Sequence, residues 1–109
     1  EQVLYIGLIT SVLLPAKQSG MSYHRLLDTM KAMGDKRRME ILTLLHQRPH
    51  YGQELAERLS LTPATISHHM NTLMQAGLIA LEQDGSRTRY SSSTETLEEL
   101  LSALRTQFL

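Results

Sequence analysis

Cysteine and tryptophan are both absent from this 109-residue sequence. Without cysteine the chain cannot form disulfides or thiolate metal sites, which fits a protein of the reducing cytoplasm. Four tyrosines and one phenylalanine are its only aromatic residues, too few for the stacking platform that binds single-stranded nucleic acid. Acidic and basic residues number 11 each, so the formal net charge is zero and any positive surface must be local.

No hydrophobic run is long enough to cross a bilayer as a helix. The stretch from Val3 to Leu14 is apolar but too short, and it lacks the basic residues that begin a signal peptide, so we expect no membrane partner. A polar connector over residues 17–20 follows it. Length and composition therefore predict an apolar N-terminal arm and linker, residues 1–20, and a single domain, residues 21–109.

Capping residues and apolar spacing predict two helices at the start of the domain. Ser22 can cap a helix that runs to about Met33 and is stopped by Gly34. Asp35 can cap the next helix, residues 36–46. The apolar side of the first helix is predicted to comprise Leu26, Leu27, Met30 and Met33.

A second pair of helices is joined by a tight turn. The third helix covers residues 52–59, and the turn is residues 60–61. Thr62 can cap a fourth helix with Pro63 in its first turn, where no backbone N–H is needed. Gly77 ends that helix. Helix, short turn, helix is the helix-turn-helix arrangement of DNA-binding proteins.

The fourth helix has one apolar and one polar face. Ile66, Met70 and Leu73 recur at helical spacing and are expected to face the core. The polar face carries groups that can hydrogen-bond to base edges, and asparagine can pair with adenine through two bonds. This combination predicts a helix that reads the DNA major groove. Its candidate contact residues are Thr62, Thr65, Ser67, His68 and Asn71.

The sequence pattern changes to a period of two after the fourth helix. Two short strands, residues 78–82 and 88–92, flank the sequence Asp84-Gly85-Ser86, and Asp-Gly is a strong hairpin signal. Thr94 can cap a last helix. The apolar stripe of that helix comprises Leu97, Leu100, Leu101, Leu104 and Phe108.

The hairpin and the second helix supply the candidate cations. Arg87 and Arg89 alternate on one strand, so both can project to the same side and enter a minor groove or contact phosphate. Tyr90 completes this candidate group. Three cations begin the second helix, where the helix dipole disfavours them, so either phosphate contact or simple solvation accounts for them. They are Lys36, Arg37 and Arg38.

Short motifs in a fixed order follow one another from the first helix to the hairpin. In the first two helices they are Met33-Gly34-Asp35, Arg38 and Ile41-Leu42. The later ones are Glu54-Leu55-Ala56, Leu61-Thr62, the run from Thr65 to Met70, Leu73, Ala76-Gly77-Leu78-Ile79, Gly85, Arg87 and Tyr90. From Leu26 onward this ordered set resembles the arsenic-repressor (ArsR/SmtB) family of bacterial transcription regulators.

The resemblance implies a mainly α protein with a small β-hairpin: a winged helix-turn-helix with flanking dimerisation helices. It implies double-stranded DNA as a partner and a homodimer formed by the first and last helices, whose surplus apolar faces suggest the same. Such a dimer reads a pseudo-palindromic operator with half-sites roughly 34–36 Å apart, about one helical turn. The expected function is sequence-specific transcription regulation in the cytoplasm, in our hypothesis repression.

Two adjacent histidines in the fourth helix have different expected roles. His68 and His69 point about 100° apart on a helix. His68 lies nearer the outer face, where the family often has arginine. His69 lies nearer the core edge and matches a frequent family histidine, so it either packs within the domain or contacts phosphate.

Metal sensing, the best-known activity of the family, is not expected here. The family's thiolate pair would fall near Tyr51 and Gln53, which are poor ligands for soft metals. The last helix has no histidine, so the histidine–carboxylate arrangement of zinc sensors is missing too. We therefore predict neither a metal nor another cofactor. The sequence also has no nucleophile elbow and no phosphate-binding glycine loop, so we predict that the protein is not an enzyme.

Two other functions stay open on the sequence alone. A winged helix that binds only proteins would fit the zero net charge and the absence of lysine and arginine from residues 62–76. The C-terminal DNA-reading domain of a longer, ligand-sensing regulator would fit the apolar start at Val3.

Overall fold

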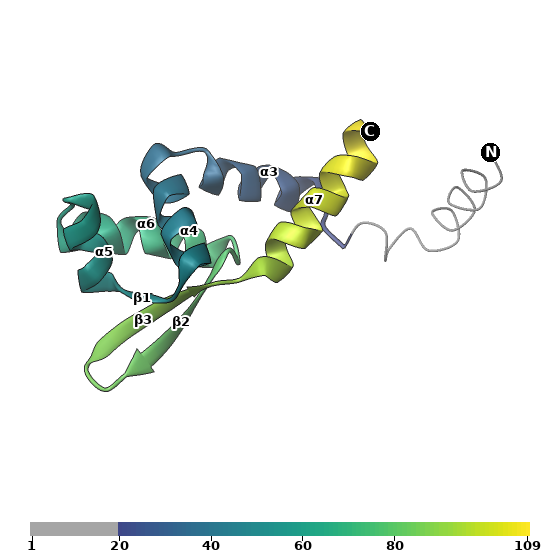
Figure 1. The fold of residues 1–109 in the computed structure, drawn as a ribbon. Coiled ribbons are helices and arrows are strands. Elements are labelled where there is room, and N and C mark those ends of the chain that lie inside the picture. Colours follow the sequence, from purple (N-terminus) through teal and green to yellow (C-terminus); the bar gives the residue numbers. More distant parts are fainter. Residues whose placement is uncertain (1–19) are drawn as a thin grey trace.

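The structure is a computed structural model that describes residues 20–109, so the predicted N-terminal arm falls on residues outside this part, apart from Gly20. Helices dominate, and a hairpin projects from one end (Figure 1). This confirms the predicted winged helix-turn-helix. None of the described helices is long and apolar enough to cross a membrane. The elements in order are α3 (Tyr23–Met33), α4 (Lys36–Gln47), β1 (His50–Tyr51), α5 (Gly52–Leu59), α6 (Pro63–Gln75), β2 (Ile79–Asp84), β3 (Arg87–Ser92) and α7 (Thr94–Phe108).

Three of the four predicted helix caps are confirmed. The side chains of Ser22, Asp35 and Thr62 each accept a hydrogen bond from the backbone N–H three residues on. The prediction of Thr94 as a cap is wrong, because Thr94 is already the first residue of α7 and Ser93 precedes it without a side-chain capping bond. The Ser93 N–H donates to the Leu78 carbonyl, so the chain is still held beside β2 when it enters α7.

The sheet has three antiparallel strands in the order β1–β3–β2. Strand β1 was not predicted from the sequence, and it pairs His50 with Tyr90 and Tyr51 with Arg89. Asp84 is the last residue of β2 and pairs with Arg87, so the hairpin turn is shorter than predicted. A two-residue loop of this kind needs a left-handed residue, and Gly85 supplies it with φ +66°.

The main core lies where α4, α5 and α6 meet the base of the hairpin. The predicted inward residues of α6, Ile66, Met70 and Leu73, are all buried there. Leu55 and Ala56 of α5 are buried beside them, and Leu59 packs at the edge. The spacing of apolar residues along both helices therefore identified their inner faces correctly.

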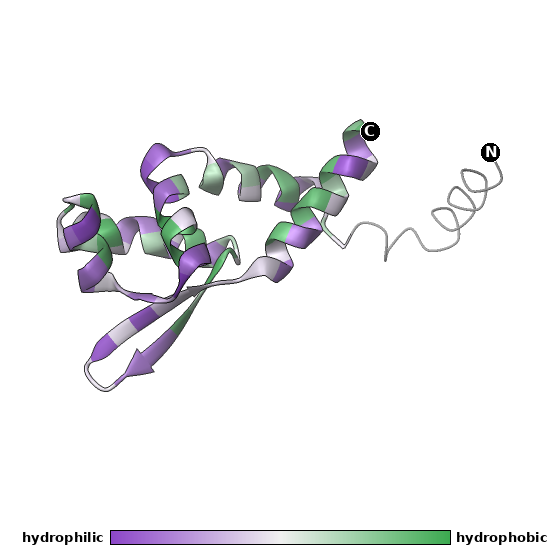
Figure 2. Ribbon diagram, viewed as in Figure 1, coloured by the Kyte–Doolittle hydropathy of each residue, from purple (hydrophilic) through white to green (hydrophobic). Residues whose placement is uncertain are grey.

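A second, smaller core joins α3 to α7, which cross at the end of the molecule opposite the hairpin (Figure 1). Its buried members are Met21, Leu26, Leu100 and Ala103. The predicted apolar stripes are wider than this core. Large apolar side chains therefore stay exposed on both helices, with exposed fractions of 39% for Leu27, 45% for Met30, 65% for Leu101 and 67% for Phe108. Hydrophobic residues recur along both helices (Figure 2).

Candidate nucleic-acid interface

The outer face of α6 carries the side chains expected to read DNA. Ser67, His68 and Asn71 are exposed. The Thr62 hydroxyl accepts from the Thr65 N–H at 3.1 Å and donates to the Thr65 hydroxyl at 2.9 Å, so these two exposed residues also hold the first turn together. Helix α6 thus presents hydroxyl, imidazole and amide groups to solvent without a charged residue among them.

His69 lies on the side of α6 that faces α4. It is half-buried, and its Nδ1 accepts a hydrogen bond from Arg38 Nη1 at 3.2 Å. Burial lowers the pKa of His69, because a charged imidazole loses hydration there. Of the two roles left open by the sequence, the geometry matches a histidine packed within the domain.

The three cations at the start of α4 have different surroundings. Arg38 donates from Nε to the Ala32 carbonyl at the end of α3, so it joins α3, α4 and α6. Arg37 pairs with Glu40 one turn further on, at 3.0 Å. Lys36 is exposed. The hydrogen bonds of Arg38 within the domain therefore explain its position in α4 without a phosphate contact.

One face of the wing carries both candidate arginines. Arg87 and Arg89 lie on the same face of β3, opposite Asp84 and Glu82 of β2. Arg89 forms an ion pair with Glu82. The Arg87 guanidinium instead lies over the ring of Tyr51, 3.4 Å from its centroid.

Tyr51 contacts the wing through its hydroxyl as well. The Tyr51 hydroxyl donates a hydrogen bond to Asp84 Oδ2 at 2.6 Å. This bond to a carboxylate raises the pKa of Tyr51, since it stabilises the protonated phenol. On the other face of β3, Tyr90 is half-buried, and burial raises its pKa.

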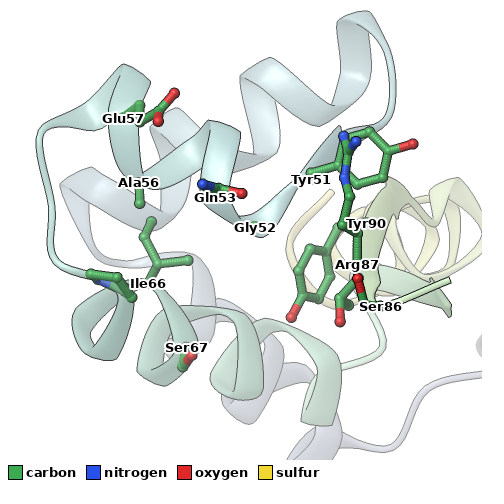
Figure 3. A pocket seen from close by; sticks show the side chains of 12 residues that line it. Tyr51, Gly52, Gln53, Ala56, Glu57, Ile66, Ser67, Ser86, Arg87 and Tyr90 are labelled. Atoms are coloured by element: carbon green, nitrogen blue, oxygen red, sulfur yellow. The ribbon is translucent and has the colours of Figure 1, made fainter. Parts of the chain in front are cut away.

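A cleft of about 580 Å³ separates α5 and α6 from the wing (Figure 3). Its apolar lining includes Ala56 and Ile66, and its polar lining includes Gln53, Ser67 and Arg87. The cleft therefore brings a residue of the predicted reading helix and a residue of the wing to one surface. Among residues 20–109, no three His, Cys, Asp or Glu side chains lie close enough together to hold a metal ion.

Two residues of this surface were not predicted from the sequence to belong to the site. Tyr51 was considered there only as a poor metal ligand, and Asp84 only as part of a turn. Their contact depends on β1, whose two residues are too few to show a period. The sequence shows only that a tyrosine precedes α5, and this does not indicate that its strand pairs with β3.

These features define a class of protein: DNA-binding transcription regulators with a winged helix-turn-helix, which are not enzymes. The sequence pattern described as "Bacterial regulatory protein, arsR family" matches residues 35–80. The arsenical resistance operon repressor of Staphylococcus aureus is 31% identical over 84 residues, which span 77% of this chain and 81% of that protein. The chain belongs to the arsR family of bacterial regulatory proteins.

Two further comparisons agree with this assignment. The transcriptional repressor SdpR of Bacillus subtilis is 33% identical over 72 residues, which span 66% of this chain and 80% of SdpR. The structure of an ArsR-like transcriptional regulator from Rhodococcus sp. RHA1 superposes with a TM-score of 0.72 at 29% identity, covering 78% of this chain and 80% of that one. Family membership favours DNA binding over the protein-only alternative.

Proposed function

We propose that this protein is a homodimeric repressor that reads a pseudo-palindromic operator through α6 and holds the DNA backbone through cations outside α6. The observation that supports the proposal is that the polar, uncharged groups and the exposed cations lie on separate surfaces, the former on α6 and the latter on the wing and the start of α4. Helix α6 exposes Ser67, His68 and Asn71 and carries no lysine or arginine. It can hydrogen-bond to bases but adds little Coulomb attraction.

The wing supplies the attraction that α6 lacks. Arg87 is exposed and is in none of the ion pairs found within residues 20–109. Lys36 is a second exposed cation, at the start of α4. A dimer doubles each of these contacts, so a chain with zero net charge can still bind a polyanion.

The exposed apolar side chains of α3 and α7 support a dimer through these helices. Leu27 and Met30 of α3, with Leu101 and Phe108 of α7, leave apolar surface beside the smaller core. Apolar surface that gathers on neighbouring elements is typical of a protein interface. A two-fold axis there would present two copies of α6 to successive major grooves.

We propose repression as the sign of regulation, and a signal other than one sensed through thiolates. Two of the relatives carry the word repressor in their names, which favours repression. The chain has no cysteine, so a signal sensed through thiolates does not fit it. We propose that such a regulator acts in the cytoplasm.

The test begins with selection of bound duplexes from random-sequence DNA by the full chain. Binding of the selected duplex is then titrated at several salt concentrations for the wild type, Arg87→Ala and Arg48→Ala. Arg48 is the control because it is an exposed arginine between α4 and β1 whose charge is already paired with Glu54. We expect Arg87→Ala to reduce the salt slope by about one for each Arg87 in contact with phosphate, and so by about two in a dimer.

Three results would contradict parts of this proposal. Equal salt slopes for the wild type and Arg87→Ala would remove the wing from the interface. Failure to select any common sequence would contradict base recognition by α6. A bound complex with one chain per duplex would contradict the proposed dimer.

A further inference from the structure

Arg87 has an acidic neighbour but does not pair with it. Its partner across the hairpin is Asp84, and side chains in such a cross-strand pair lie close enough for an ion pair. The Asp84 carboxylate instead accepts the Tyr51 hydroxyl at 2.6 Å. The next pair on the same face of the hairpin, Glu82 and Arg89, does form the expected ion pair. In the pair nearer the turn the Tyr51 hydroxyl is bonded to the acid, whereas in the other pair the acid meets its arginine directly.

The guanidinium of Arg87 rests on the Tyr51 ring rather than extending into solvent. Its central carbon lies 3.4 Å from the ring centroid. A planar guanidinium that stacks through its face keeps its N–H groups free at the edges. Within residues 20–109, no hydrogen bond of the Arg87 side chain to another residue is found, so these donors are unused.

The geometry points to Tyr51 as the residue that positions Arg87 for contact with the DNA backbone. The inference rests on the proposed function, in which Arg87 binds DNA. Tyr51 acts in two ways: its ring carries the guanidinium, and its hydroxyl occupies the carboxylate of Asp84 that would otherwise neutralise Arg87. Because the guanidinium is ordered before binding, less conformational entropy is lost when a phosphate is bound.

The place of Tyr51 in the chain makes it suited to this role. It lies in β1, which runs directly into α5 and pairs with β3, whereas Arg87 and Asp84 lie at the tip of the hairpin. Tyr51 and Arg87 both line the cleft (Figure 3). Contact through both ring and hydroxyl therefore fixes the wing relative to α5. Arg87 and Ser67 of α6 line the same cleft, so a backbone contact and a base-reading helix are held together.

A double-mutant cycle on the 109-residue chain tests the contact between Tyr51 and Arg87. The probe is the duplex recovered by selection, and the variants are Tyr51→Leu, Arg87→Ala and both together. Tyr51→Leu removes both the ring and the hydroxyl, so we expect it to weaken binding more than Tyr51→Phe does, and by at least about two- to fivefold, the size of an exposed cation–π contact. In the Arg87→Ala background we expect Tyr51→Leu to have no further effect. Thermal unfolding of each variant shows that the domain is folded at the binding temperature.

A rescue experiment tests the hydroxyl. Tyr51→Phe keeps the ring but frees Asp84 to pair with Arg87, so we expect weaker binding, by about two- to fivefold. Adding Asp84→Asn removes the competing charge, and the pair Tyr51→Phe with Asp84→Asn is expected to bind like the wild type. A tyrosine that only stabilised the fold would not be rescued by loss of its hydrogen-bond acceptor.

The outcomes separate this inference from the proposed function. Weaker binding by Tyr51→Leu, to the same degree with and without Arg87, would overturn the positioning role and leave the repressor proposal intact. No rescue by Asp84→Asn would overturn the role of the hydroxyl. If Arg87→Ala alone left affinity and salt slope unchanged, the wing contact itself would fail, and the positioning role would fail with it.

Discussion

Arg38 of α4 donates a hydrogen bond from Nη1 to Nδ1 of His69 on α6, at 3.2 Å. Through Nε, the same side chain donates to the Ala32 carbonyl at the end of α3. One arginine therefore links α3, the helix with the exposed apolar face, to α6, the helix that we propose reads the DNA. The link requires a neutral imidazole, because Nδ1 can accept a hydrogen bond only when it carries no proton.

Protonation of His69 is expected to destabilise the fold. Burial holds the pKa of His69 below its value in an unfolded chain, which is about 6.5. The unfolded chain thus takes up the proton at a higher pH, so the contribution of neutral His69 is full above about pH 6.5 and is lost as the pH falls through the lowered folded value. Urea unfolding at several pH values between about 8 and about 5 measures the effect.

His69→Asn isolates this contribution, since the asparagine oxygen can still accept from Arg38 but does not titrate. We expect the pH dependence of the unfolding free energy to flatten over this range. His46→Asn is the matched control, because His46 is exposed on α4 and its replacement leaves the buried site intact. An equally steep pH dependence in His69→Asn and in the wild type would show that His69 is not the group responsible.

Gly77 is expected to tolerate a side chain less well than Gly85. Both have positive φ, +75° and +66°. A Cβ on Gly77 would lie 3.0 Å from the Thr96 hydroxyl oxygen, whereas nothing lies within 4 Å of a Cβ on Gly85. Left-handed backbone alone costs a residue with Cβ roughly 1–2 kcal/mol, so Gly85→Ala reports that cost. Gly77→Ala adds the contact with buried Thr96, and we expect it to cost about 1 kcal/mol more.

Urea unfolding of the two variants checks this difference, and two further variants that combine Gly77→Ala with a change at Thr96 test its cause. Combining Gly77→Ala with Thr96→Ser keeps the oxygen, whereas combining it with Thr96→Ala removes it. The extra loss of unfolding free energy in Gly77→Ala, relative to Gly85→Ala, is expected to shrink only with Thr96→Ala. The effect of each Thr96 variant alone is subtracted first. An equal loss of unfolding free energy in Gly77→Ala and Gly85→Ala would mean that the structure near Thr96 shifts to accept the new Cβ without measurable strain.

Helix positions were predictable here because their signals are local. Ser22, Asp35 and Thr62 are caps that act over three residues, and Gly77 ends α6 through its own backbone angle. The family was recognisable from the sequence for the same reason, because each of its motifs is short and local. Thr94 failed as a cap because a distant bond, from the Ser93 N–H to Leu78, decides how the chain enters α7.

The arrangement of side chains at the interface was less predictable, because it depends on pairing across the sheet. Arg87 and Arg89 look equivalent in sequence. They differ in the fold, since Arg89 meets Glu82 whereas Arg87 meets the ring of Tyr51. Only the register of β1, β2 and β3 separates an arginine held in an ion pair from one with free N–H groups.

Asn71 is expected to specify a base pair without adding much to general DNA affinity. Its side chain is exposed on α6, and an amide can pair with adenine through two hydrogen bonds. Asn71→Ala should relax preference at one position of each half-site by about 1–3 kcal/mol and leave the salt slope unchanged. Gln75→Ala is the control, because Gln75 is an exposed amide at the C-terminal end of the same helix. Selection from random DNA with each variant gives the measurement, and an unchanged preference in Asn71→Ala would remove it from base reading.

Met30 and Met39 offer a matched test of the dimer. Their exposed fractions are almost equal, 45% and 46%, but Met30 lies on α3 beside the α3–α7 core whereas Met39 lies on α4. A glutamate at an apolar interface would be buried without a partner in both copies, so we expect Met30→Glu to dissociate the dimer. Met39→Glu, with the same change of charge, should leave it intact.

Sedimentation equilibrium of both variants decides where the chain associates, and DNA titration follows the consequence. A monomer holds only one half-site, so Met30→Glu should lose at least about tenfold in affinity for the full operator while keeping its affinity for an isolated half-site. Dissociation by Met39→Glu instead would move the interface to α4. Two monomeric wild-type chains that bind the operator without cooperativity would show that the apolar surface of α3 and α7 serves another partner.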